Sequence, residues 1–102
     1  MNALRTRKDI EIDFVKACNQ SRELMDISNS LFKIAGSDMM ETMAMMRLSW
    51  QGSNAESFYD KTEKLRTELM NNAEDLVRIA NHINHTADII YHAEMIAIGV
   101  CS

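Results

Sequence analysis

The chain contains no proline and only three glycines among its 102 residues. Proline removes a backbone donor and clashes with the preceding turn of a helix, so its absence favours long, uninterrupted helices. A chain of this length forms one domain at most. The sequence therefore predicts an all-α fold that occupies residues 1–102 as a single domain.

Cysteine is scarce as well, and the two in the chain are Cys18 and Cys101. In a chain folded back on itself at its midpoint, Cys18 lies opposite roughly position 86, far from Cys101. At ~1.5 Å per helical residue the two thiols are ~20 Å apart, too far for an intrachain disulfide. We therefore expect both cysteines to act as small buried or half-buried apolar residues.

The sequence has neither a long apolar run nor an excess of positive charge. Its longest apolar run, Met95–Cys101, falls well short of the ~20 residues that a membrane span needs. The net charge of −4 offers no basic face to nucleic acid. Asp9, Glu11 and Asp13 stand where a signal peptide has its apolar core. We therefore expect no nucleic-acid partner, no stable membrane insertion and no export by the general secretory route.

The only tryptophan lies near the midpoint, in the stretch Trp50-Gln51-Gly52. Gly52 adopts positive φ without a steric clash, which suits a residue just past the end of a helix. Ser53 and Glu56 have the spacing of a capping box and predict the start of a second helix. So short a loop makes the two helices antiparallel. The sequence thus predicts a hairpin with helices at about 8–50 and about 54–98 around a turn at about 50–53, and Trp50 in the last turn of the first helix.

Apolar residues recur every three or four positions along both predicted helices, although Ser21 and Ser28 weaken the first stripe. Both stripes are wider than the contact of two helices needs, so a lone hairpin exposes apolar surface along its length. We therefore expect the antiparallel two-helix hairpin to dimerise into a four-helix bundle. The candidate dimer interface consists of apolar side chains from both stripes: Phe14, Leu24, Leu31, Met39, Met43, Met46, Leu65, Leu69, Leu76 and Ile83.

Gly36 is the one weak point within the first predicted helix, because glycine costs ~1 kcal/mol there relative to alanine. Asp38 and Glu41 resemble a new helix start. One alternative is a continuous helix that is weakened at Gly36, and the other is two helices that break there. The stripe resumes in phase at Met39, which favours the continuous helix.

The sequence offers no pattern for catalysis or metal binding. His82 and His85 share a helical face, but two-metal sites in helical bundles use Glu-x-x-His motifs, and the chain has none. Paired zinc-binding cysteines and glycine-rich phosphate loops are absent too. We therefore expect no catalytic, cofactor-binding or metal-binding residues and no enzymatic activity. A metal-binding bundle enzyme is the alternative that elemental analysis would test.

The Trp50-Gln51-Gly52 turn, at the centre of a proline-free helical chain of this length, resembles the Trp-x-Gly (WXG) family of ESAT-like proteins. The resemblance covers nearly the whole chain. It implies a hairpin that dimerises antiparallel with a second copy or with a related WXG-like protein. It also implies a cytoplasmic protein that the type VII (Ess/ESX) secretion ATPase of Gram-positive bacteria exports without a cleaved signal peptide.

The family's export signal, Tyr-x-x-x-Asp/Glu near the C-terminus, is not matched here, since Tyr91 precedes Glu94 by only three residues. A looser form of that signal fits Ile90, Glu94, Ala97 and Cys101, which share one helical face. In the alternative interpretation, Ile90 and Ala97 are ordinary contact residues and Glu94 is a helix-end charge.

The resemblance implies a small secreted protein that acts through protein–protein interaction. The alternative function is a cytosolic adaptor that pairs with the helical N-terminal domain of a larger type VII toxin. The two hypotheses share the same apolar stripes, so co-purification with such a toxin domain is the observation that separates them.

Overall fold

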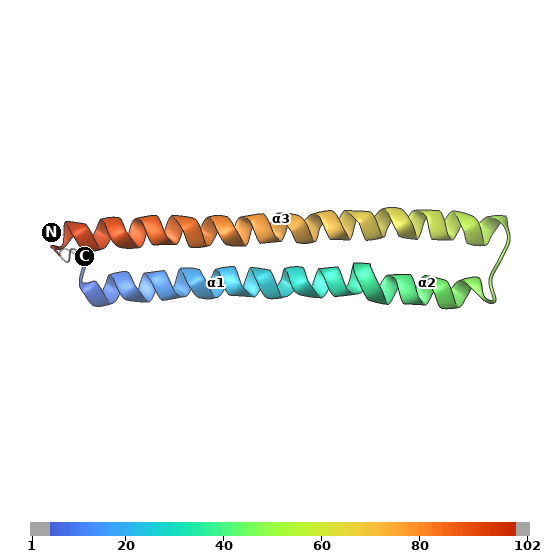
Figure 1. The fold of residues 1–102 in the computed structure, drawn as a ribbon, viewed down its shortest axis with the longest axis horizontal. Coiled ribbons are helices and arrows are strands. Elements are labelled where there is room, and N and C mark those ends of the chain that lie inside the picture. The colour runs from blue at the N-terminus through green and yellow to red at the C-terminus, as the bar shows by residue number, and fades with distance from the viewer. Residues whose placement is uncertain (1–4, 100–102) are drawn as a thin grey trace.

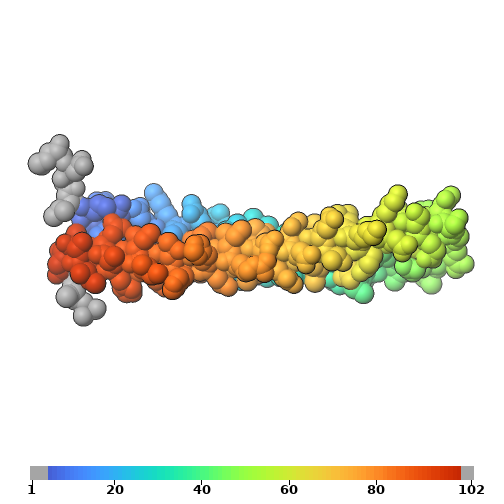
Figure 2. All heavy atoms as spheres, turned by 90° about the horizontal axis from the view of Figure 1, so that it is seen from above, coloured from blue at the N-terminus to red at the C-terminus, as the bar shows by residue number. Residues whose placement is uncertain are grey.

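The computed structural model describes residues 5–99 and contains helices only. Its elements are α1 (Arg7–Lys33), the π-helical turn η1 (Ile34–Asp38), α2 (Met39–Arg47) and α3 (Ser53–Ala97). The prediction of an all-α fold is confirmed. In Figure 1, α3 runs back along α1 and α2, so the described chain is a two-armed hairpin. The molecule is a thin rod of 71 × 26 × 16 Å, as Figure 2 also shows from a second direction.

The start of α1 is fixed by a capping box that our sequence analysis did not identify. The Thr6 hydroxyl accepts a hydrogen bond from the Asp9 N–H (3.1 Å), and the Thr6 N–H donates to the Asp9 carboxylate (3.2 Å). These two bonds satisfy backbone donors that the first helical turn leaves unpaired. The spacing Thr6-x-x-Asp9 is visible in the sequence and is the signal that predicts this start.

The turn between the arms differs from the prediction in two respects. The helix α2 ends at Arg47, so Trp50 lies beyond its last turn rather than within it. Gly52, with φ 112°, is the N-cap of α3 and not the residue that ends the first arm. The predicted capping box between Ser53 and Glu56 is wrong, because Gly52 has no side chain to act as a cap and Ser53 is already helical. Positive φ is the reason for glycine at this position.

The closest contact between the arms is made by small residues, which we call the central seam: Ser21, Ser28 and Ala35 on the first arm and Ala73, Ala80 and Ala87 on α3. The Ser21 hydroxyl donates to the Ala80 carbonyl and the Ser28 hydroxyl to the Ala73 carbonyl, both at 2.8 Å. A step of seven residues forward along α1, from Ser21 to Ser28, thus corresponds to a step of seven residues backward along α3, from Ala80 to Ala73. The buried hydroxyls are satisfied and fix the register of the two arms.

The π-helical turn η1 lies at the next step of this register. There α3 supplies the donor instead of the first arm, because Arg66 of α3 donates a hydrogen bond to the Ala35 carbonyl (3.3 Å). The extra residue of a π-helical turn also changes which side chain faces inward after it. A regular step of seven from Ala35 leads to Thr42, yet Thr42 is exposed and Met43 is buried. The first arm is therefore neither a regular helix nor two separate ones, and η1 turns Met43 of α2 toward α3.

Candidate interaction surface

An aromatic cluster closes the turn end of the hairpin. Tyr59 is 1% exposed, and its hydroxyl donates to the Trp50 carbonyl at 2.8 Å. The Trp50 ring meets those of Phe58 and Tyr59 with centroids 5.2 and 5.8 Å apart. The Arg47 guanidinium stands 4.2 Å over the Tyr59 ring, within the range of a cation–π contact. The indole itself is 40% exposed, so the tryptophan of the turn is available for a further contact.

Five large apolar side chains, each just before an inward-facing residue, form a second surface, which we call the apolar flank: Ile27, Ile34, Phe58, Leu65 and Ile79. Each of these side chains is between 41% and 51% exposed. The positions before Ser21, Ala73 and Ala87 carry polar residues and interrupt this flank: Gln20, Asn72 and Thr86. Because the arms are antiparallel, positions just before the innermost residues lie on the same side of the hairpin. One long side of the rod is therefore lined by large, half-exposed apolar side chains.

The opposite side differs sharply in composition. Seven of the residues that immediately follow inward-facing positions are polar and exposed, and we call them the polar flank: Arg22, Asn29, Asp60, Thr67, Glu74, Asn81 and Asp88. Isolated exposed apolar residues are ordinary in soluble proteins, whereas several large ones gathered on one side mark an interaction surface. The contrast between the two flanks thus indicates that one side of the rod is built for contact.

The residues predicted for the dimer interface are distributed over three environments. Phe14 packs against Tyr91 near the open end, with ring centroids 4.7 Å apart and the ring planes tilted by 42°. Met43 packs inside its own hairpin against Ala55 and Tyr59. Leu65 belongs to the apolar flank, and the rest are half-buried beside it: Leu24, Leu31, Met39, Met46, Leu69, Leu76 and Ile83.

A hollow of about 180 Å³ interrupts the apolar flank near the turn. Its walls are mainly apolar and come from η1, α2 and the start of α3: Asp38, Met39, Thr42, Met43, Met46, Phe58 and Thr62. Three of these residues are methionines, whose flexible thioethers adapt to the shape of an incoming group.

The predicted export-signal residues lie at the other end of α3. Ile90 is 50% exposed, and Ala97 is the last residue of α3. Glu94 is half-buried and forms an ion pair with Arg5, at 2.7 Å between Nε and Oε2. Cys101 lies outside the described residues, so the structure brings together only three members of the predicted group.

Arg5 connects the two arms at the open end. Besides Glu94 it contacts the Asp13 carboxylate and the Asp9 carbonyl. The hydrogen bond to Asp13 is the main cause that holds the pKa of Arg5 above its ordinary value, with the nearby charges of Asp13 and Glu94 adding to it. The sequence alone does not predict this contact, because residues 5 and 94 are brought together only by the register of the two arms.

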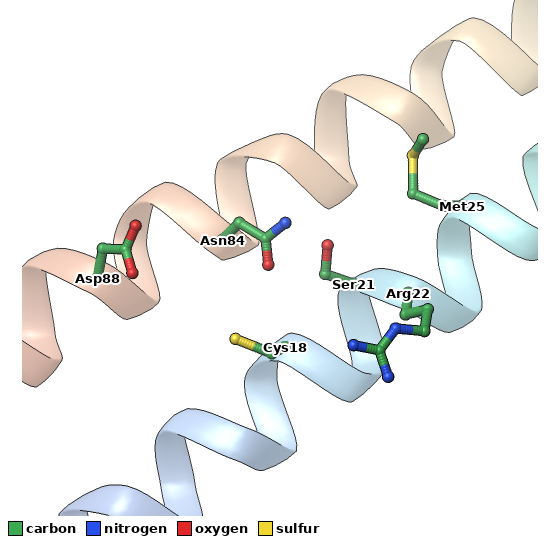
Figure 3. A pocket seen from close by; sticks show the side chains of 6 residues that line it. All are labelled: Cys18, Ser21, Arg22, Met25, Asn84 and Asp88. Carbon is green, nitrogen blue, oxygen red and sulfur yellow. The ribbon is translucent and has the colours of Figure 1, made fainter.

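Another hollow, of about 490 Å³, lies on the polar flank. Figure 3 shows its lining from both arms: Cys18, Ser21, Arg22, Met25, Asn84 and Asp88. The Cys18 thiol is free and half-buried, and the only fully buried polar group of this lining, the Ser21 hydroxyl, already bonds to α3. The hollow is therefore the space that small seam residues leave open.

Among residues 5–99 no group of three or more His, Cys, Asp or Glu side chains is placed to hold a metal ion. His82 and His85 are both exposed on α3. No helix in the described part of the chain has the length and apolar character that crossing a membrane requires.

Comparison of the chain with protein-family models, with curated proteins and with solved structures finds no match. The resemblance to WXG proteins therefore depends on the turn residues Trp50 and Gly52 and on the helical pattern around them.

Proposed function

We propose that the protein is a small secreted ESAT-like protein that acts as a pair of hairpins and leaves the cell through a type VII secretion system. The apolar flank is the observation that carries this proposal. The Trp50-x-Gly52 turn between the two arms supports the choice of export route. The partner in the pair is a second copy of the chain or a related WXG-like protein.

The apolar flank favours pairing on energetic grounds. Burying a large apolar side chain completely contributes about 1.5–3 kcal/mol, so covering one that is half-exposed contributes about 1 kcal/mol. Two flanks of five such side chains then supply about 10 kcal/mol, which is of the order of the cost of association. The half-buried side chains beside the flank, such as Leu69 and Leu76, add the surplus that makes the pair stable.

The positions of the hollow and of Ile90 favour an antiparallel pair. The midpoint of α3 is Asp75, and the hollow between Phe58 and Thr62 lies as far before it as Ile90 lies after it. A two-fold axis beside Asp75 therefore places Ile90 of each hairpin at the hollow of the other. A parallel pair places the two hollows at the same level and leaves both unfilled, which a well-packed interface avoids.

Disulfide trapping tests this arrangement. In a chain with Cys18→Ser and Cys101→Ser, we introduce Thr62→Cys and Ile90→Cys together. These positions are ~42 Å apart within one α3, so a disulfide between them forms only between two chains. We expect a covalent dimer under mild oxidation, with the 62–90 link identified by mass spectrometry.

The matched control is Asp60→Cys with Asp88→Cys, which has the same separation on the polar flank. It should stay monomeric under the same oxidation. Sedimentation that shows a stable monomer of the unmodified chain at micromolar concentration would contradict the pairing. A monomer that instead binds the helical domain of a toxin would support the adaptor function.

Export is tested separately in a host that has the secretion system. We expect the protein in the culture supernatant of the parent strain and its loss when the secretion ATPase is deleted. Glu94→Ala should reduce export while leaving the covalent dimer intact. Glu68→Ala, an exposed change in the middle of α3, is the control and should export normally. Equal export in all strains would sink the type VII proposal.

A further inference from the structure

A second hollow, of about 240 Å³, lies at the open end of the hairpin. Its interior is apolar and aromatic, with the tilted rings of Phe14 and Tyr91 in contact at a centroid distance of 4.7 Å. Asp13 of α1 and Glu94 of α3 also line it, so two carboxylates from different arms converge on one small space. Such a combination of aromatic surface and acidic groups has the chemistry that binds a cationic side chain.

A cation from the chain itself already pairs with both carboxylates, while the hollow that they line stays open. The Arg5 guanidinium contacts Glu94 through Nε at 2.7 Å and Asp13 through a terminal nitrogen. Arg5 precedes the N-cap of α1, so neither helix depends on it for its own hydrogen bonds. Its side chain is 45% exposed, and exposed ion pairs exchange readily with competing charges.

The geometry selects a guanidinium rather than any cation. Arginine presents several N–H donors in one plane, so it bonds two carboxylates at once and stacks on aromatic surface. Lysine offers a compact point charge with neither property. Arg7 is a useful contrast, because it pairs only with Glu11 one turn away on the same helix.

We propose that this hollow is a guanidinium-binding site whose two carboxylates are held by Arg5 in the free hairpin, and that an arginine side chain of a partner protein takes them over by exchange. The hollow reaches the side of the rod that carries the apolar flank through Ile90, which also lines it. The assignment of the ligand to a protein partner therefore rests on the pairing proposed above. The site itself does not, since all its members belong to one chain.

The test uses N-acetyl-arginine amide as the probe, titrated into isotope-labelled protein and followed by NMR. We expect Arg5→Ala to bind it about two- to fivefold more tightly than the unmodified chain, because an exposed internal ion pair no longer competes. The largest shifts should come from Glu94 and Tyr91. Adding Glu94→Gln to Arg5→Ala should abolish the response.

Two controls keep the result specific. Arg7→Ala removes an equal charge from the same segment and should bind the probe like the unmodified chain. N-acetyl-citrulline amide has the same shape without the charge and should not bind. Arg5→Gln, checked by circular dichroism, repeats the measurement if the alanine variant loses helix.

Equal affinity of Arg5→Ala and the unmodified chain, or an equal response to citrulline, would overturn the guanidinium site. Neither outcome involves the secretion machinery or the covalent dimer, so the function proposed above would be unaffected. Conversely, a failed disulfide-trapping experiment would leave the site in place and remove only its assignment to a paired hairpin.

Discussion

At the closed end of the hairpin Tyr59 fills the space between the arms, whereas in the middle Ser28 and Ala73 bring the arms so close that little space is left. The closed end combines a buried phenol with methionine and tryptophan. The central seam uses residues of one or two side-chain atoms and hydroxyl-to-carbonyl bonds. Large side chains thus supply apolar burial at the turn, and small ones set the distance and register along the rod.

The two regions should therefore fail in opposite ways. A core built from large side chains is sensitive to the removal of volume, because a cavity remains. A contact built from small side chains is sensitive to added volume, because the arms must separate. The following changes test this difference in order of expected effect.

Tyr59→Ala should have the largest effect, with a loss of about 3–5 kcal/mol in the free energy of unfolding. The change removes the ring that packs against Met43 and supports Trp50. Urea denaturation measures the loss. Tyr59→Phe separates the ring from the hydroxyl and should cost only about 1 kcal/mol, the value of the bond to the Trp50 carbonyl. Equal losses for the two variants would contradict the importance of the ring.

Ala80→Leu should destabilise the hairpin by about 1–3 kcal/mol, because the added side chain forces the arms apart beside Ser21. Hydrogen exchange should rise most in α1 and α3 next to this position. Asn81→Leu places the same leucine side chain on the polar flank and should change the stability by less than about 0.5 kcal/mol. A tolerated leucine at Ala80 would show that the close approach of the arms is not required.

Ser28→Ala should cost about 1 kcal/mol, since it removes one buried hydrogen bond and almost no volume. Thermal unfolding measures it, with the exposed Ser30→Ala as the control that reports helix propensity alone. A Ser28 variant as stable as its control would mean that the hydroxyl bond to Ala73 contributes nothing to the seam.

Acid should have the smallest effect and should act at the start of α1, outside both regions. Hydrogen bonds from the backbone and then the hydroxyl of Thr6 hold the pKa of Asp9 below its ordinary value near 3.8. A lowered carboxyl pKa stabilises the fold above the ordinary value, and that contribution is lost as the pH falls through the folded value. Amide exchange in the first turn should increase from about pH 4 downwards, and Thr6→Ala should remove most of this dependence.

Composition and periodicity were enough to predict the all-α class, because the absence of proline and the three-and-four spacing act along the whole chain. The width of the apolar stripes likewise pointed to surface left uncovered by a single hairpin. The spacing of apolar residues carries no information about side-chain volume. Ser21 and Ser28 looked like defects in a stripe, although their spacing of seven from Ala35 is the signal for the closest contact in the molecule.

The second arm shows the same error in another form. Large residues such as Leu65 and Ile79 defined its predicted stripe, yet Ala73 and Ala80 face α1 most directly. Ranking residues by hydrophobicity selects the larger side chains as the contact, whereas the smaller side chains determine the distance between the two helices. Contacts such as Arg5 with Glu94 depend on the register between the two arms, and the apolar spacing within one helix does not reveal that register.

The π-helical turn η1 marks a place where the length of the chain can change without rearranging the hairpin. A π-helical turn is an α-helix that has absorbed one more residue. Deleting the exposed Ser37 would make α1 and α2 one regular helix and leave the methionine that is now Met43 opposite Tyr59. A deletion at Ser30 would instead rotate everything after it by ~100° against α3. We therefore expect natural homologues of this chain to differ by single residues near position 37 and to keep a constant length elsewhere along both arms.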